Sequence, residues 1–191
     1  MRKAATLILL VGCAILVGAT YSKAQPGPPA GPPQGLAQVV ALDECDPTSF
    51  NAVLGESGGG FCHNVALATF GYATVLSDLV MGAENGTPDP GWDFEPDLLT
   101  IKQGTIVSVV DQGGEPHTFT EVKHFGGGFI PQLNGPGEHT IPECAGGFGK
   151  VAVARTRMLQ GSQLQVTGLA PGEHLFQCCI HPWMRVKVEV K

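Results

Sequence analysis

The sequence predicts an all-β domain, a sandwich or barrel of short strands preceded by a partly helical extension. Two observations predict this class. After residue 92, short apolar runs rich in Val and Thr recur at close spacing and are separated by Gly and Pro, which is typical of strands and turns. The 191 residues are 43% hydrophobic, with 27 Gly and 15 Pro, a composition that lets one domain bury a real core.

The first 24 residues have the pattern of a secretory signal. A basic start at residues 2–3 precedes an apolar run over 4–18, and small residues predict cleavage after Ala24. The apolar run is short for a membrane-spanning helix. The alternative is a lipid anchor at Cys13. It is less favoured because apolar residues continue beyond that cysteine. We therefore expect a periplasmic or secreted protein with no stable membrane insertion after cleavage.

Changes in composition divide the rest of the chain. Residues 25–37 are rich in Pro and Gly and predict an extended linker. Residues 38–91 form an N-terminal extension, and residues 92–191 form the β domain. A Gly/Pro-rich stretch over 126–150 reads as an inserted loop within that domain.

The extension is predicted to contain two short helical segments. Asp46 or Thr48 caps a helical turn that ends near Gly55. Apolar residues at helical spacing predict a helix over about 70–81, with Thr69 as its N-cap and Gly82 as its stop signal.

Period-two apolar patterns and intervening turns predict the strands of the β domain. A turn at Gln103-Gly104 separates the first two. The expected strands cover residues 98–102, 105–111, 117–125, 150–156, 162–169, 175–179 and 184–190.

The last hairpin gathers soft ligand atoms in one short turn. Met184 shares a strand face with Val186 and the valines that follow it, so it points into the core. On the incoming strand Cys178 points inward, Cys179 points outward, and His181 lies in the connecting turn. A thiolate, an imidazole and a thioether therefore meet at one end of a sheet.

This set of atoms is suited to copper. Two His and one Cys with a weak axial Met form a type 1 (blue) copper site, and His117, after a Gly-rich turn, supplies the second imidazole. Zinc is the rival metal, but a thioether is a poor zinc ligand. Alternatively, Cys178 and Cys179 each join a disulfide and no metal binds. The remaining histidines receive no role: His63, His124, His139 and His174.

The sequence resembles the cupredoxins, the small blue copper proteins of the amicyanin and plastocyanin type. The resemblance is carried by Pro116-His117 and by the closing turn Cys-Cys-Ile-His-Pro-Trp-Met at 178–184, and it covers about 93–191. It implies a Greek-key β-sandwich and one copper ion. His117, Cys178 and His181 are the implied equatorial ligands, and Met184 is the implied axial ligand.

Two features accompany the resemblance. The family often has an Asn six residues before the first His ligand, tying the ligand loops together, and this chain has Asp111 there. With Cys178 on copper, four cysteines remain after the signal, and three pairings stay open. Closeness in sequence favours Cys45 with Cys62, which leaves Cys144 with Cys179.

Charge narrows the function classes. After removal of the signal the chain has 8 basic and 17 acidic side chains, and residues 38–101 hold ten acids without any Lys or Arg. Such a chain repels phosphates, so we expect no nucleic-acid partner.

We expect an exported one-electron carrier that cycles Cu(I)/Cu(II). A closed ligand set leaves no position for substrate, so we expect no enzyme. The expected monomer meets a redox partner protein through a surface around His181 and Trp183, and its acidic segment either steers a basic partner or is a solvated face. The alternatives are a copper-binding or sequestering protein and a metal-free cupredoxin-like interaction module.

Overall fold

The computed structural model describes residues 35–54, 62–63 and 73–191. These residues lie in one compact unit, Gly31–Lys191. The predicted signal and the linker up to residue 34 are outside the described residues. Within the described ranges no helix has both the length and the apolar character needed to cross a membrane.

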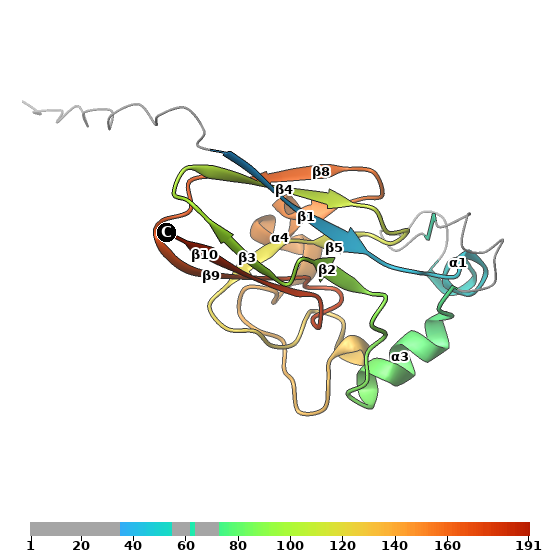
Figure 1. Cartoon of the computed structure of the whole chain (residues 1–191). Coiled ribbons are helices and arrows are strands. Elements are labelled where there is room, and N and C mark those ends of the chain that lie inside the picture. The colour runs from blue at the N-terminus through green and yellow to red at the C-terminus, as the bar shows by residue number, and fades with distance from the viewer. Residues whose placement is uncertain (1–34, 55–61, 64–72) are drawn as a thin grey trace, which may run out of the picture. The chain divides into compact units, whose positions relative to one another are not determined.

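Two mixed four-stranded sheets form the body of this unit (Figure 1). The first has the order β2-β1-β4-β8, and the second has the order β3-β10-β9-β6. The strands of the first sheet are β1 (Gly35–Leu42), β2 (Asp93–Glu95), β4 (Thr105–Asp111) and β8 (Gln163–Val166). Those of the second are β3 (Leu98–Ile101), β6 (Thr120–Val122), β9 (Gly172–Gln177) and β10 (Arg185–Val190). A small third pair joins β5 (His117–Thr118) to β7 (Arg157–Met158).

The core lies between the two large sheets, as the period-two patterns predict. In β10 the valines are buried while the charged residues between them are partly exposed. Val39 and Ala41 of β1 and Val107 and Val109 of β4 meet the valines of β10 in one cluster. The all-β sandwich is therefore confirmed, and most of the predicted strands of residues 92–191 are present.

Strand β1 is the largest difference from the sequence prediction. It occupies residues 35–42, where the end of the linker and the start of the extension were expected. It pairs in parallel with β4 from Gly35↔Thr105 to Ala41↔Asp111. Only Val39 and Ala41 of this strand are fully buried, so its alternation of apolar residues is too short to predict a strand directly after a Pro/Gly-rich run. The extension thus supplies a central strand of the first sheet.

The helices confirm the predictions in part. Helix α1 (Pro47–Leu54) begins after Asp46, whose Oδ2 accepts a hydrogen bond from the Ser49 N–H at 2.7 Å. Helix α3 (Leu76–Glu84) begins later than predicted, and Thr69 and residues 70–72 lie outside the described residues. Gly82 does not end this helix. A Cβ there would lie 2.8 Å from the Thr87 carbonyl oxygen, so the glycine permits a close approach.

The predicted strand over residues 150–156 is wrong. This segment is helix α4 (Val151–Arg155), in which Val153 is buried and Val151 is exposed. A run of two alternating valines is too short to define a period. Val153 packs against the Cys144–Cys179 disulfide, and that contact requires only one apolar side chain. The loop over 126–150 holds two 3-10 turns, η1 (Pro131–Leu133) and η2 (Gly147–Gly149).

Candidate metal centre

The predicted ligands come from two loops at one end of the sandwich. His117 begins β5, after the loop that follows β4. Cys178 directly follows β9, and Met184 directly precedes β10. The turn between them is closed by two backbone hydrogen bonds, from Cys178 N–H to the Met184 carbonyl and from Met184 N–H to the His181 carbonyl, both 3.0 Å.

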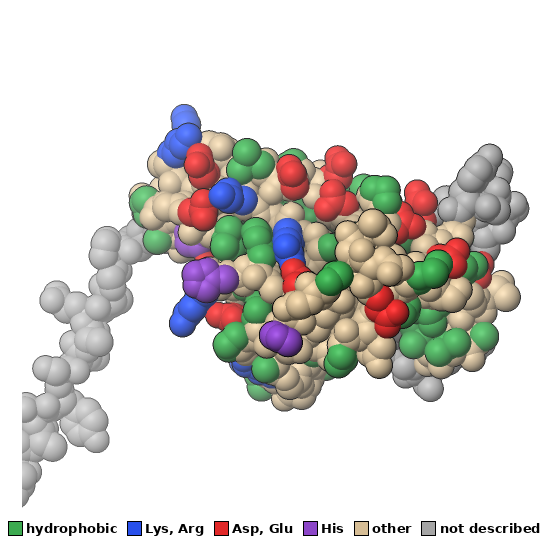
Figure 2. Space-filling view, turned by 90° about the horizontal axis from the view of Figure 1, so that it is seen from below, with side chains coloured by type: hydrophobic (Ala, Val, Ile, Leu, Met, Phe, Trp, Pro, Cys, Tyr) green, Lys and Arg blue, Asp and Glu red, His purple; other side chains and the backbone are tan. Residues whose placement is uncertain are grey.

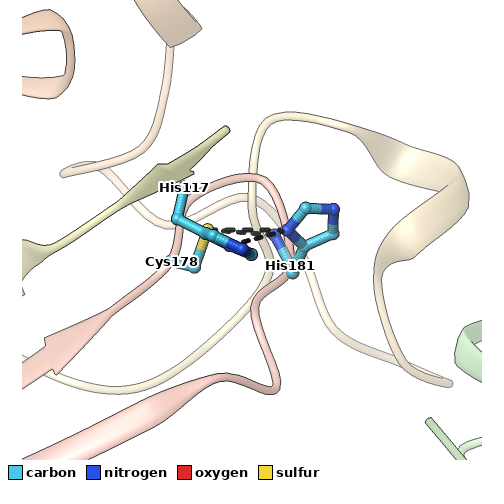
Figure 3. Close-up of side chains that lie close together, drawn as sticks. All are labelled: His117, Cys178 and His181. Carbon is cyan, nitrogen blue, oxygen red and sulfur yellow. Dashed lines mark hydrogen bonds between the residues drawn. The ribbon is translucent and has the colours of Figure 1, made fainter. Parts of the chain in front are cut away.

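Three donor atoms face one another in the interior (Figure 3). The Cys178 Sγ lies 3.9 Å from His117 Nδ1 and 3.8 Å from His181 Nδ1, and the two Nδ1 atoms are 3.4 Å apart. All three side chains are buried. The sequence prediction that these three residues meet is confirmed, and each imidazole presents the same nitrogen toward the sulfur.

The surroundings of Cys178 favour its thiolate. The backbone N–H groups of Thr118 and His181 each donate to the sulfur at 3.4 Å. Burial alone would raise the pKa of the Cys178 thiol, but hydrogen bonds and charge from His117 and His181 outweigh it and hold this pKa well below its usual value. The chain therefore prepares the ionised sulfur that a soft metal ion requires.

Met184 lies at the base of the same turn. Its side chain is fully buried in the cluster that contains Cys178, Val186 and Val188. This placement agrees with the strand face predicted for it. A buried thioether next to a thiolate and two imidazoles matches the donor chemistry of a type 1 copper site.

Asp43 is a residue of the site that the sequence prediction missed. It follows β1, and its Oδ2 lies 2.9 Å from His117 Nε2, with both side chains inaccessible to solvent. Burial lowers the pKa of His117, but the hydrogen bonds to Asp43 and Cys178 outweigh it and hold this pKa well above its usual value. No local motif marks Asp43, because only the pairing of β1 with β4 brings it to His117, 74 positions away.

Two further carboxyl groups are buried near His117. Burial raises the pKa of Asp111 to about 7 and that of Glu115 to about 9. Asp111 Oδ1 accepts a hydrogen bond from the Gly113 N–H at 3.1 Å, whereas Asp111 Oδ2 and Glu115 Oε1 have no hydrogen-bond partner among the described residues. Burial therefore favours the neutral forms of these two side chains.

The tie between the ligand loops comes from Thr118. Its Oγ1 accepts a hydrogen bond from the Cys179 N–H at 2.7 Å, and its own N–H donates to the Cys178 sulfur. The side chain of Asp111, at the position where the resemblance places an Asn, bonds within its own loop instead. Thr118 therefore connects the two ligand loops, the role that the resemblance gives to an Asn at position 111.

Two tryptophans cover His181. The ring of Trp92 lies edge-on to His181 with centroids 4.7 Å apart, and the ring of Trp183 lies 5.6 Å away. The Trp183 Nε1–H donates to the Trp92 carbonyl at 3.1 Å. His181 is only 2% exposed, so the expectation that it lies at the surface is wrong. The ring of Trp92 causes the difference, because it packs over the ligand turn.

Two disulfides account for the other cysteines of the described residues. Cys45 bonds to Cys62 and Cys144 bonds to Cys179, which is the pairing favoured above, and Cys178 is free and buried. Adjacent Cys178 and Cys179 therefore lie on opposite sides of the chain, one in the main core and one against the 126–150 loop. The alternative in which Cys178 and Cys179 both join disulfides is wrong.

Comparisons with known proteins find similar solved structures only. Neither a scan against protein-family models nor a search of curated proteins gives a match. Among solved structures the chain is similar to a purple cupredoxin from Nitrosopumilus maritimus, with 17% identity over 57% of this chain and 95% of that one (TM-score 0.36). It is also similar to a reduced amicyanin variant, with 21% identity over 52% of this chain and 73% of that one (TM-score 0.32).

A third similar structure is a copper-containing nitrite reductase from Thermus scotoductus, with 22% identity over 53% of this chain and 20% of that one (TM-score 0.33). All three TM-scores are below 0.5, so the class of the protein rests on its own strands and site. That class is a β sandwich of two mixed sheets. Its buried His-Cys-His cluster, with Met184 beside it, is consistent with a type 1 copper site.

Proposed function

We propose that this chain is an exported mononuclear type 1 copper protein that carries one electron at a time. The observation that carries the proposal is the cluster of Cys178 Sγ and the Nδ1 atoms of His117 and His181, all within 3.9 Å of one another. The donors come from two loops tied by Thr118, which holds the loops close together.

Each ligand has a distinct part in the proposal. His117, Cys178 and His181 supply the equatorial donors, and Met184 supplies the weak axial one. Copper bound there would supply a one-electron Cu(I)/Cu(II) couple. The buried protein groups would exclude water and keep the donors in place in both oxidation states. Four protein ligands leave no position for a substrate, which supports electron transfer rather than catalysis.

The proposed partner surface follows from the two tryptophans that cover His181. Trp183 is partly exposed and contacts His181, so we propose that a redox partner protein docks around Trp183 rather than on the histidine edge itself. In Figure 2 the Lys and Arg side chains lie in the left half of the face, while the right half shows only acidic charge. This distribution supports a partner with a basic docking face.

Cysteine use supports export. Two disulfides are stable in an oxidising compartment and uncommon in a reducing one. Together with the predicted cleavage after Ala24, they support a periplasmic or secreted protein. Mass spectrometry of the native protein tests this directly: a chain starting at Gln25 is expected, and a lipidated Cys13 would replace it under the alternative.

The burial of His181 favours one competing function. A ligand covered by Trp92 and Trp183 is shielded from a partner, as would suit a protein that binds or sequesters copper without a redox partner. Reversible cycling at constant copper content separates the two functions. A carrier reoxidises repeatedly, whereas a sequestering protein exchanges electrons slowly or loses copper on reduction.

The first experiment is a visible absorption spectrum of residues 25–191 after addition of Cu(II), with Cys178→Ala as the matched variant. We expect an intense blue thiolate-to-copper band in the first sample and none in the second. Absence of the band with intact cysteines would contradict the proposal. Tight zinc binding would then indicate a zinc site, and no binding of either metal would indicate a metal-free interaction module.

A further inference from the structure

The N-terminal extension reaches the metal centre through one side chain, Asp43. The parallel pairing of β1 with β4 ends at Ala41↔Asp111, and the Gln112 N–H donates to the Ala41 carbonyl at 2.9 Å. The chain then turns so that Asp43 points into the loop that leads to His117. A strand absent from the predicted domain thus delivers a carboxylate to the far side of a predicted ligand.

The carboxylate of Asp43 is fixed from several directions. Its Oδ2 accepts the Glu115 N–H at 2.9 Å, and its Oδ1 accepts the Cys45 N–H at 3.2 Å. Cys45 is itself fixed by the disulfide to Cys62. A Cβ on Gly113 would lie 1.8 Å from Asp43 Oδ2, so the loop leaves room for the carboxylate only because that residue is glycine.

The contact with His117 determines which ring nitrogen carries a proton. An ionised carboxylate only accepts hydrogen bonds, so the 2.9 Å contact requires a proton on His117 Nε2. Nδ1, on the side that faces Cys178 and His181, is then the ring nitrogen left for a metal ion. Carboxylates that hold ligand histidines in this way fix the ring and increase its basicity.

We propose that Asp43 is a positioning residue of the metal centre, which holds His117 in its metal-binding orientation and lowers the reduction potential through its negative charge. The redox part of this inference rests on the proposed function. A negative charge stabilises the oxidised centre, which carries one more positive charge than the reduced one. The site is dry on both sides of His117, so the charge is weakly screened.

Two readouts test the proposal, one of them independent of copper. In the metal-free chain, nitrogen NMR should show His117 Nε2 protonated, with an exchange-protected proton that loses its protection in Asp43→Ala. In the copper-loaded chain, Asp43→Asn should shift the Cu(II)/Cu(I) equilibrium at least tenfold toward the reduced form. For one electron this corresponds to a potential about 59 mV higher. Glu44→Gln is the control, since it removes the same charge one residue away.

The outcomes separate this inference from the proposed function. An unprotonated His117 Nε2 in the wild-type chain would overturn the inference whatever metal binds, even if the Asp43 variants failed to fold. A potential shift in Asp43→Asn no larger than that in Glu44→Gln would overturn it as well. Absence of the blue band in the wild-type chain would instead refute the proposed function, and the NMR result would still decide the role of Asp43.

Discussion

The Cys144–Cys179 disulfide should supply much of the stability of the 126–150 loop. Its removal in a Cys144→Ala/Cys179→Ala double variant frees a loop of 35 residues in the unfolded chain. The chain-entropy relation gives a loss of unfolding free energy of about 4 kcal/mol for a loop of this length. The matching Cys45→Ala/Cys62→Ala variant removes a disulfide that closes a separation of 17 residues, and it should lose about 3 kcal/mol by the same relation.

Urea unfolding of the metal-free proteins measures both losses, with the denaturant slope checked for constancy. The blue band should survive in the Cys144→Ala/Cys179→Ala variant, because the proposed ligand is Cys178 and the adjacent cysteine faces the other way. A loss below about 1 kcal/mol at an unchanged slope would refute the entropic reasoning. Loss of the band in a folded variant would refute the assignment of separate roles to the two adjacent cysteines.

Three further variants test the site and its surroundings. Gly113→Ala should destabilise the protein by about 2 kcal/mol, measured in urea, because its Cβ would collide with the Asp43 carboxylate; an unchanged midpoint would contradict this. Trp92→Ala should cost about 3–5 kcal/mol in thermal unfolding and speed copper removal by a chelator; equal removal rates would mean that this ring does not cover the centre. The hydrogen bond that His174 Nδ1–H donates to the Glu121 carboxylate raises the pKa of His174, so its stabilisation is present below about pH 6.5 and lost as the pH rises through the raised value. Glu121→Gln should therefore cost a few tenths of a kcal/mol at pH 5.5 and nothing at pH 9, and an equal cost at both would refute the linkage.

The sequence was informative where the pattern is local. The alternation in residues 184–190 defines β10, and the spacing of Cys178, His181 and Met184 defines the ligand turn. Only His117 had to be found at a distance, from the second imidazole that the ligand set requires and from its place after a Gly-rich turn, and the resemblance to cupredoxins agreed with it. These residues could be predicted because each signal lies within a few positions of the chain.

What could not be predicted depends on pairing between distant segments. Strand β1 becomes recognisable only beside β4, and Asp43 becomes part of the site only through that pairing. The burial of His181 under Trp92 has the same origin, since the tryptophan lies 89 positions earlier in the chain. In helix α4 a local pattern was misleading. Its alternating valines predicted a strand, but Val153 packs on a disulfide from a helix.

The opposite orientation of Cys178 and Cys179 also has a consequence for oxidative folding. A shift of one position along β9 would exchange the two thiols, placing Cys179 among the histidines and Cys178 against Cys144. The same shift would turn Phe176 out of the core and bring Gln177 into it. Correct pairing of the sulfur atoms is thus enforced by the apolar side chains of the strand, so folding itself separates the disulfide sulfur of Cys179 from the free thiol of Cys178.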